Sequence, residues 1–213
     1  MVLTTRRLTL VPITLPMVEA IFANDRRTAE QLAGAKLPAA WPGRALIERA
    51  FTADLEAIRR DPGKRLWGDR LMLTREPEPR VVGSVVFHGF PEDGVAEVGY
   101  GVEADSQGQG LATEATATCV DWALSQPGIQ AVTASTFPWH YASLRVIARI
   151  GMHRIGSREH DLLGELWVFE RRGTRTLSGV HPVASPPSLL EKACPLYFSG
   201  ISGGPTCPTY SIA

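Results

Sequence analysis

Two glycines one residue apart stand directly before a helix-like run, and this pattern is the strongest chemical signal in the sequence. Gly108 and Gly110 lie in the stretch Gln107-Gly-Gln-Gly-Leu-Ala112, which follows a strand-like run. The first N–H groups of a helix lack intrahelical partners, and the helix dipole makes that end positive. Such a helix start binds phosphate. The stretch therefore predicts a site for a pyrophosphate-bearing ligand.

Three ligand classes use a glycine loop before a helix, and spacing distinguishes them. A P-loop requires Gly-Lys-Ser/Thr, whereas Leu111 and Ala112 follow Gly110 here. The dinucleotide fingerprint requires a third glycine, whereas that position is Thr113. Coenzyme A binding is the third class. A tight turn that binds no ligand is the alternative that these residues leave open.

Outside this loop, four side chains are candidates for acid–base chemistry. Glu97 opens the strand before the loop and could act as a base through water, or could be a solvated carboxylate at a strand end. Glu114 is a weaker candidate, because the helix dipole favours a carboxylate in the first turn anyway. Ser143 and Tyr141 begin a later helix, and their hydroxyls are the other two candidates. Ser143 could instead cap that helix.

The hydrophobic pattern predicts the elements that position these residues. Apolar alternation and β-branched runs predict strands over residues 8–11, 66–74, 81–90, 96–102, 130–136, 152–156 and 166–171. Helical spacing predicts helices over residues 15–24, 45–60, 111–124 and 141–150, with Pro62-Gly63 ending the second. Residues 34–43 are expected to be irregular. The mixture predicts an α+β fold.

Composition limits the classes of partner and compartment. Lys plus Arg (22) equals Asp plus Glu (22), which gives no indication of a broad nucleic-acid surface. The cysteines Cys119, Cys194 and Cys207 are too far apart for a disulfide framework or a metal motif. No metal is therefore expected, and a cytoplasmic location is expected. Cys119 lies on an apolar helix stripe, which predicts a buried and inert thiol. No apolar run is long enough to span a membrane.

The chain of 213 residues suits one domain with an appendage. Residues 1–172 are expected to form the domain. Residues 173–213 are dense in Ser, Pro and Gly and are expected to form a C-terminal tail. Residues 6–17 imitate a short signal peptide, but Pro12 and Pro16 interrupt them, and a strand at the N-terminus fits better.

Three ordered segments resemble the GCN5-related N-acetyltransferase (GNAT) family. The stretch from Gln107 to Ala112 matches the family signature Gln/Arg-x-x-Gly-x-Gly/Ala, and the longer run to Ala115 is similar to the branch that acetylates the N-termini of ribosomal proteins. Residues 4–13 resemble the opening strand of the family. Residues 141–152 resemble its Asn-x-x-Ser helix, with His140 where the family has Asn. The resemblance covers residues 3–172.

The resemblance implies a three-layer α+β fold. Its central sheet is mixed and mostly antiparallel, with about six to seven strands and about four flanking helices. The sheet is splayed between the fourth and fifth strands, here residues 97–102 and 131–136, and acetyl-CoA lies between them as co-substrate. The implied activity is direct transfer of acetyl to a primary amine in a ternary complex. The alternative is a coenzyme A-binding sensor or scaffold that has no turnover.

The resemblance also implies roles for individual residues. Glu97 would be the base, and Ser143 or Tyr141 the proton donor to the departing sulfur. A bulge near residues 99–101 would free a backbone N–H for the oxyanion, an effect of about 3 kcal/mol in other acyl-transfer enzymes. The expected coenzyme contacts are Tyr100, Gly101, Val102, Gln107, Gly108, Gln109, Gly110, Leu111, Ala112, Thr113, His140 and Ser143.

The acceptor is the least determined part. An α-amine costs about 1 kcal/mol to deprotonate at pH 7 and a lysine about 4.6 kcal/mol. With one candidate base, the site suits the α-amine of a protein N-terminus or a small-molecule amine. The first two helices and their connection, with Leu37, Trp41 and Pro42, are expected to line the acceptor site. Neither nucleic acid nor a membrane is expected as a partner, and a homodimer stays open.

Overall fold

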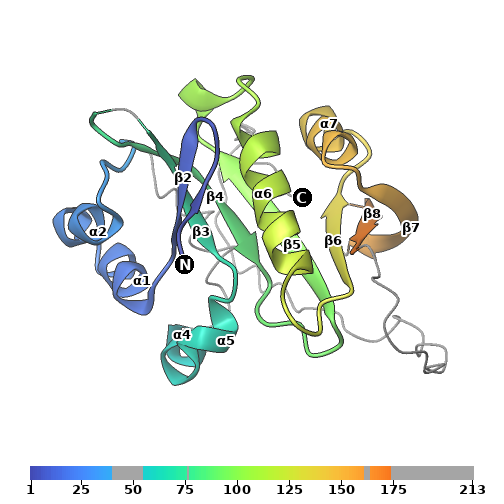
Figure 1. The fold of residues 1–213 in the computed structure, drawn as a ribbon, viewed down its shortest axis with the longest axis horizontal. Coiled ribbons are helices and arrows are strands. Elements are labelled where there is room, and N and C mark those ends of the chain that lie inside the picture. The colour runs from blue at the N-terminus through green and yellow to red at the C-terminus, as the bar shows by residue number, and fades with distance from the viewer. Residues whose placement is uncertain (40–54, 76, 161–163, 174–213) are drawn as a thin grey trace. The chain divides into compact units, whose positions relative to one another are not determined.

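The strands of the computed structural model form one mixed sheet (Figure 1), and the structure describes residues 1–39, 55–75, 77–160 and 164–173. Among these residues the sheet has eight strands in the order β1-β2-β3-β4-β5-β6-β8-β7. Only the β5–β6 pair is parallel within this described part. The strands are β1 (Leu3–Thr4), β2 (Leu8–Pro12), β3 (Arg70–Thr74), β4 (Val81–Phe87), β5 (Val95–Val102), β6 (Ala131–Thr136), β7 (His153–His160) and β8 (Gly164–Arg172). This arrangement confirms the expected α+β class.

Helices pack on both faces of the sheet and bury two hydrophobic clusters. One cluster joins β2, β4, β5 and β6 to α6 and α7, and α6 crosses in front of the strands in Figure 1. The other joins β3 to α1, α2 and α4. The helices are α1 (Leu15–Phe22), α2 (Arg26–Ala33), α4 (Leu55–Arg60), α5 (Pro62–Arg65), α6 (Leu111–Leu124) and α7 (Tyr141–Arg149), and η1 (Ala104–Ser106) is a short 3₁₀ turn.

One local expectation about helices was wrong. Helix α2 was not expected, although its ends carry ordinary signals, because the Asp25 side chain accepts from the Thr28 N–H at 3.1 Å and Gly34 ends the helix at φ 66°. The second expected helix ends at Arg60, as predicted, and Pro62 then begins the short helix α5. Asp61 caps that helix, and a proline in the first turn loses no intrahelical hydrogen bond.

Other boundaries follow from the same local signals. Strand β3 begins at Arg70 and not at residue 66, since residues 66–68 form a turn after α5. Residues 45–54 of the second expected helix lie outside the described residues, and its last six residues form α4. The expected acceptor residues Trp41 and Pro42 also lie outside them, as does almost all of the expected tail, so the domain boundary stays a prediction.

The sheet opens between β5 and β6. Their parallel pairing covers only Val95–Glu97 opposite Ala131–Thr133. Beyond Glu97, β5 continues against β4, and β6 continues against β8. We call the point where the β5–β6 pairing ends the fork. It confirms the expected splay.

The backbone groups at the fork are freed by this divergence and not by the expected bulge near residues 99–101. The register between β4 and β5 runs without a shift from Phe87↔Val98 to Gly83↔Val102. The Glu97 carbonyl accepts from the His88 N–H on the β4 side. Alternate residues of a strand present their backbone groups to opposite neighbours. The N–H and C=O groups of Val98 and Tyr100 therefore point toward the open side of β5.

Candidate active site

The glycine loop, residues 107–110, gives α6 an open N-terminus. Gly110 is the N-cap residue at φ 78°, and no side chain caps the helix. The Glu114 N–H makes a helical bond to the Gly110 carbonyl at 3.1 Å, so the three N–H groups before it have no helical partner. A Cβ at Gly108, whose φ is 73°, would have no heavy atom within 4 Å. The loop therefore has the form expected of a phosphate site.

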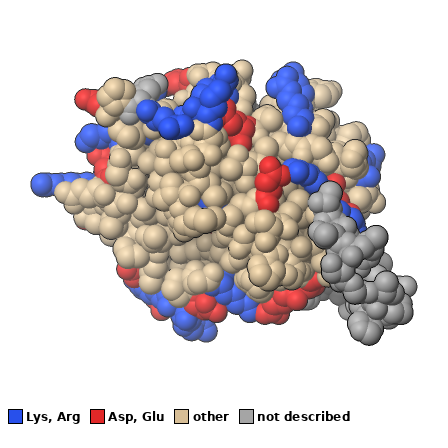
Figure 2. Space-filling view, viewed as in Figure 1, with Lys and Arg blue, Asp and Glu red and all other residues tan. Residues whose placement is uncertain are grey.

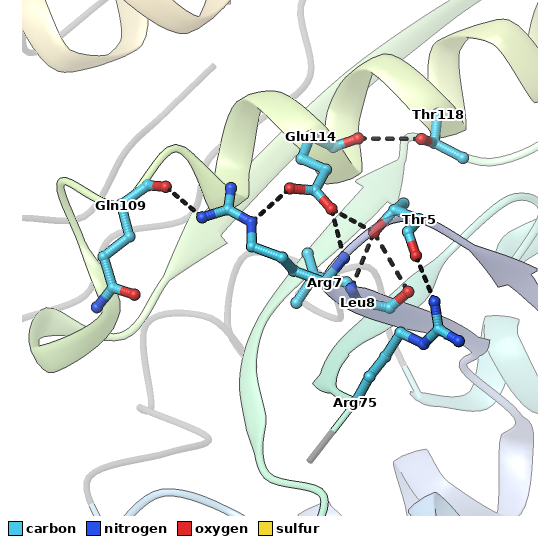
Figure 3. A network of polar contacts seen from close by, with 7 residues as sticks. All are labelled: Thr5, Arg7, Leu8, Arg75, Gln109, Glu114 and Thr118. Atoms are coloured by element: carbon cyan, nitrogen blue, oxygen red, sulfur yellow. Dashed lines mark hydrogen bonds and ion pairs between the residues drawn. The ribbon is translucent and has the colours of Figure 1, made fainter.

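Side chains from the loop and from the N-terminal strand region hold this helix start in place (Figure 3). The Gln107 amide donates to the Val102 carbonyl at 3.0 Å. Arg7 Nε donates to Glu114 Oε2 at 2.7 Å, and Arg7 Nη1 donates to the Gln109 carbonyl at 2.8 Å. The Thr5 hydroxyl and the Arg7 N–H both donate to Glu114 Oε1, at 2.6 and 2.8 Å. These contacts fix the loop relative to the sheet.

This network makes Glu114 a poor candidate for a base. Burial acts to raise the pKa of Glu114, but hydrogen bonds from Thr5 and Arg7 outweigh burial and lower it. The carboxylate is thus committed to holding the helix. Arg7 was not identified from the sequence, because it is 107 residues away from Glu114 and no local pattern links them. Its Nη2 lies 3.6 Å from the point where a Gly110 Cβ would be, so it adds positive charge beside the loop.

A buried hydroxyl pair lies on the α7 side of the fork. The Tyr100 hydroxyl oxygen lies 2.9 Å from Ser143 Oγ and 3.2 Å from the Ser143 carbonyl, and Ser143 is fully buried. Burial raises the pKa of Tyr100, so its hydroxyl stays protonated. If that hydroxyl donates to Ser143 Oγ, the serine proton is left free for another acceptor. The structure thus brings together two residues that the sequence placed in the site.

Two neighbours of this pair have other surroundings than expected. His140, and not Ser143, caps α7, because His140 Nδ1 accepts from the Ser143 N–H at 3.0 Å. The Tyr141 side chain is 71% exposed, so it is less well placed than Tyr100 to donate a proton inside the sheet. His140 as a coenzyme contact and Tyr141 as a donor stay predictions.

Glu97 belongs to a second polar group, the carboxylate cluster of His88, Glu97, Ser135 and Arg158. Glu97 Oε1 accepts from Ser135 Oγ at 3.0 Å and from Arg158 Nη2 at 2.9 Å. Glu97 Oε2 lies 3.4 Å from His88 Nδ1. Burial acts to raise the pKa of Glu97, but His88, Arg158 and Ser135 lower it to about 2. No local pattern in the sequence pointed to His88, which follows β4, or to Arg158, which lies in β7.

The two polar groups lie on opposite faces of β5. Tyr100 packs in the cluster under α6 and α7. Glu97, Gly99 and Gly101 alternate with it, and the register aligns Gly101 with Ser84 of β4 and then with Leu71 of β3, which belongs to the cluster under α1 and α2. The freed backbone of β5 therefore has hydroxyl donors on one face and the carboxylate cluster on the other.

Four wider properties bear on the chemistry. Acidic and basic side chains are interspersed around the face that α6 covers, and its centre is largely uncharged (Figure 2). Burial raises the pKa of the Cys119 thiol to about 12, which agrees with an inert thiol. Within the described ranges, no group of three or more His, Cys, Asp or Glu could hold a metal ion. None of the helices described there is long and apolar enough to cross a membrane.

Comparison with known proteins agrees with this geometry. Residues 7–153 match the family described as acetyltransferase (GNAT) domain. YjdG, an uncharacterized N-acetyltransferase of Bacillus subtilis (strain 168), is 24% identical over 171 residues, which cover 78% of this chain and 96% of that protein.

Two solved structures share the fold. The ribosomal-protein-S5-alanine acetyltransferase of Vibrio fischeri superposes with a TM-score of 0.55 at 14% identity, covering 81% of this chain and 97% of that one. Mycobacterium smegmatis RimJ in complex with CoA-disulfide superposes with a TM-score of 0.54 at 18% identity, covering 80% and 86%. At these identities the likeness establishes the fold. The family match spans more than half of the sequence, so this chain belongs to the GNAT acetyltransferase family and is an acetyl-CoA-dependent N-acetyltransferase.

Proposed function

We propose that this enzyme transfers acetyl from acetyl-CoA directly to a primary amine, either the α-amine of a protein N-terminus or a small-molecule amine. The observation that carries this proposal is the alignment of an uncapped helix start with an open fork in the same strand-loop-helix unit, residues 95–124. The ribosomal-protein acetyltransferases of the same fold support a protein N-terminus as one acceptor class.

The residues fit coenzyme A as the carrier of the acetyl group. The three free N–H groups at residues 111–113, with Arg7 beside them, suit its pyrophosphate. The strand-like backbone groups of Val98 and Tyr100 suit its amide-containing arm, which could bond to them as a further strand would. When bound, the coenzyme supplies a thioester whose carbonyl carbon an amine can attack.

Each polar group has a proposed task on its own face of β5. Free N–H groups of β5 stabilise the negative charge that develops on the carbonyl oxygen. The Tyr100–Ser143 pair provides the proton for the departing sulfur. The carboxylate cluster around Glu97 promotes proton removal from the amine. Cys119 takes no part, because its thiol is fully buried and remains protonated, and this favours a ternary complex over an acetylated cysteine.

The activity is tested by release of free coenzyme A thiol with a panel of acceptors. The panel comprises peptides with alanine or serine at the N-terminus, the same peptides with a blocked N-terminus and one internal lysine, and small primary amines. We expect thiol release with free α-amines or small amines, with the acetylated product identified by mass spectrometry. Release with the lysine peptides alone would contradict the proposed acceptor class.

The coenzyme site is tested by charge introduced at matched glycines. Gly108 (φ 73°) and Gly128 (φ 83°) have similar backbone conformations, and a Cβ at either would have no heavy atom within 4 Å. The backbone cost of a glutamate is therefore similar at both. We expect Gly108→Glu to weaken acetyl-CoA binding by at least about tenfold, or about 1.4 kcal/mol, and Gly128→Glu to leave it unchanged. Equal affinity in both folded variants would contradict the assignment of the loop.

A further inference from the structure

His88 and Glu97 face each other across β4 and β5 where the sheet begins to open. The His88 N–H donates to the Glu97 carbonyl at 3.1 Å, so the residues are cross-strand neighbours. Their side chains share a face, with His88 Nδ1 at 3.4 Å from Glu97 Oε2. Glu97 is the last residue of β5 that pairs with β6. The pair therefore lies at the fork, next to the backbone groups freed there.

The other contacts of Glu97 make it a poor proton acceptor. Ser135 from β6 and Arg158 from β7 both donate to Oε1, and they leave Oε2 to His88. A carboxylate that accepts several hydrogen bonds and lies beside a guanidinium is stabilised in its charged form. The Glu97 side chain is 23% exposed and the His88 side chain is 49% exposed, so the imidazole is the more accessible partner.

We propose that His88 is the residue that takes the proton from the incoming amine and that Glu97 is its positioning residue. This inference rests on the proposed function. A carboxylate that accepts from Nδ1–H fixes the imidazole tautomer and leaves the lone pair of Nε2 as the proton acceptor. Imidazole exchanges protons near neutral pH, where an α-amine must also lose its proton. Arg158 and Ser135 keep Glu97 charged and oriented for this task.

Two protons leave the amine nitrogen during the reaction. An ammonium ion gives one proton to Nε2 of His88, which passes it to water. The amine lone pair forms the N–C bond to the acetyl carbon, and the C–S bond breaks with its electron pair going to sulfur. The sulfur gains a proton from the Tyr100–Ser143 side, and the second proton that the nitrogen loses as the amide forms replaces it by way of solvent. The net products are the amide, the free thiol and one released proton.

The test compares His88→Ala and His88→Gln in the full chain, with a peptide α-amine as acceptor. We expect kcat to fall by about 100-fold or more in both variants, as for loss of a general base. The affinity for acetyl-CoA should stay within about twofold of wild type, a difference of less than 0.5 kcal/mol. Added imidazole should raise the kcat of His88→Ala at least about tenfold, because the vacated space admits a small base. The acid limb of the pH profile of kcat/KM should also change shape in the His88 variants.

Controls separate this role from packing and from the proposed function. His153→Gln, at an exposed position in β7, should leave kcat unchanged. Glutamine at position 88 can still contact Glu97 but cannot carry a proton at neutral pH, so wild-type activity in a folded His88→Gln variant would overturn the inference. Failure of imidazole to restore His88→Ala would also overturn it. A wild-type enzyme that binds acetyl-CoA but acetylates no amine would instead contradict the proposed function itself.

Discussion

Glu97 and Glu114 are both carboxylates paired with an arginine, yet their surroundings give them different tasks. Glu114 accepts from Arg7 and Thr5, which belong to the N-terminal strand region, and its pKa is lowered. Glu97 accepts from Arg158 and Ser135 but keeps one oxygen beside a half-exposed histidine. The first carboxylate joins a helix to a sheet. The second faces the fork through His88.

A carboxylate that neighbouring side chains keep charged is not by that fact a catalytic residue. In both cases hydrogen bonds and an opposite charge overcome the effect of burial on the pKa. What separates the two is position. Glu114 lies in the first turn of α6 below the glycine loop, and Glu97 lies where two strands part. The substitutions below should therefore have different consequences at the two sites.

The largest effect is expected from Glu97→Gln. The change removes the charge that orients His88 and leaves Arg158 without its partner carboxylate, so we expect kcat to fall by about 100-fold, equivalent to about 2.7 kcal/mol. The affinity for acetyl-CoA should not change. Steady-state thiol release and titration calorimetry measure the two quantities. A similar loss of kcat in Glu114→Gln at saturating acetyl-CoA would remove the distinction between the carboxylates.

The next effect is expected from Glu114→Gln, and it should appear in stability. The change weakens three hydrogen bonds that tie α6 to the N-terminal strand region, so the free energy of unfolding should fall by about 1–3 kcal/mol. Urea unfolding measures this loss. Asp121→Asn is the control on the same helix, since its pair with Arg171 is more exposed and should contribute less than about 1 kcal/mol. Equal losses would argue against a special role for the Glu114 network.

A smaller effect is expected from Tyr100→Phe on the opposite face of the fork. The ring still packs, but the hydroxyl that contacts Ser143 is lost. We expect kcat to fall by about tenfold, or about 1.4 kcal/mol, because water or Ser143 alone can still protonate the sulfur. With acetyl donors whose thiol is a better leaving group, the loss of kcat should be smaller. Tyr141→Phe is the control, and an equal loss there would favour Tyr141 as the donor.

The smallest effect is expected in the acid dependence of stability. The pKa of Glu97 is lowered from 4.5 to about 2 by folding, so its stabilising contribution is present above about pH 4.5 and is lost as the pH falls toward 2. Wild type should therefore lose more stability than Glu97→Gln between about pH 5 and about pH 3. Urea midpoints at both pH values measure the difference. Parallel losses in the two proteins would show that folding does not perturb this carboxyl.

Local patterns predicted the elements whose signals are short-range. The helix after the glycine loop has its expected bounds, Leu111–Leu124, because an apolar stripe and the glycine before it act within a few turns. The strand before the loop was also predicted to within one residue. Helix α2 was missed although Asp25 and Gly34 carry cap signals, because its core contacts are two alanines and its apolar stripe is weak.

The residues of the candidate site likewise fall into those indicated by local patterns and those brought together by distant contacts. The sequence alone indicated the glycine loop through its spacing, and it indicated Glu97, Tyr100 and Ser143 through the resemblance to the family. The roles of these residues stay predictions. Only the tertiary structure brought Arg7 to Glu114, and His88 and Arg158 to Glu97. Those partners lie up to 107 residues apart in the sequence, and the register of the sheet decides that His88 and Arg158 meet Glu97. Sheet pairing also decided that strand divergence, and not a bulge, frees the backbone of β5.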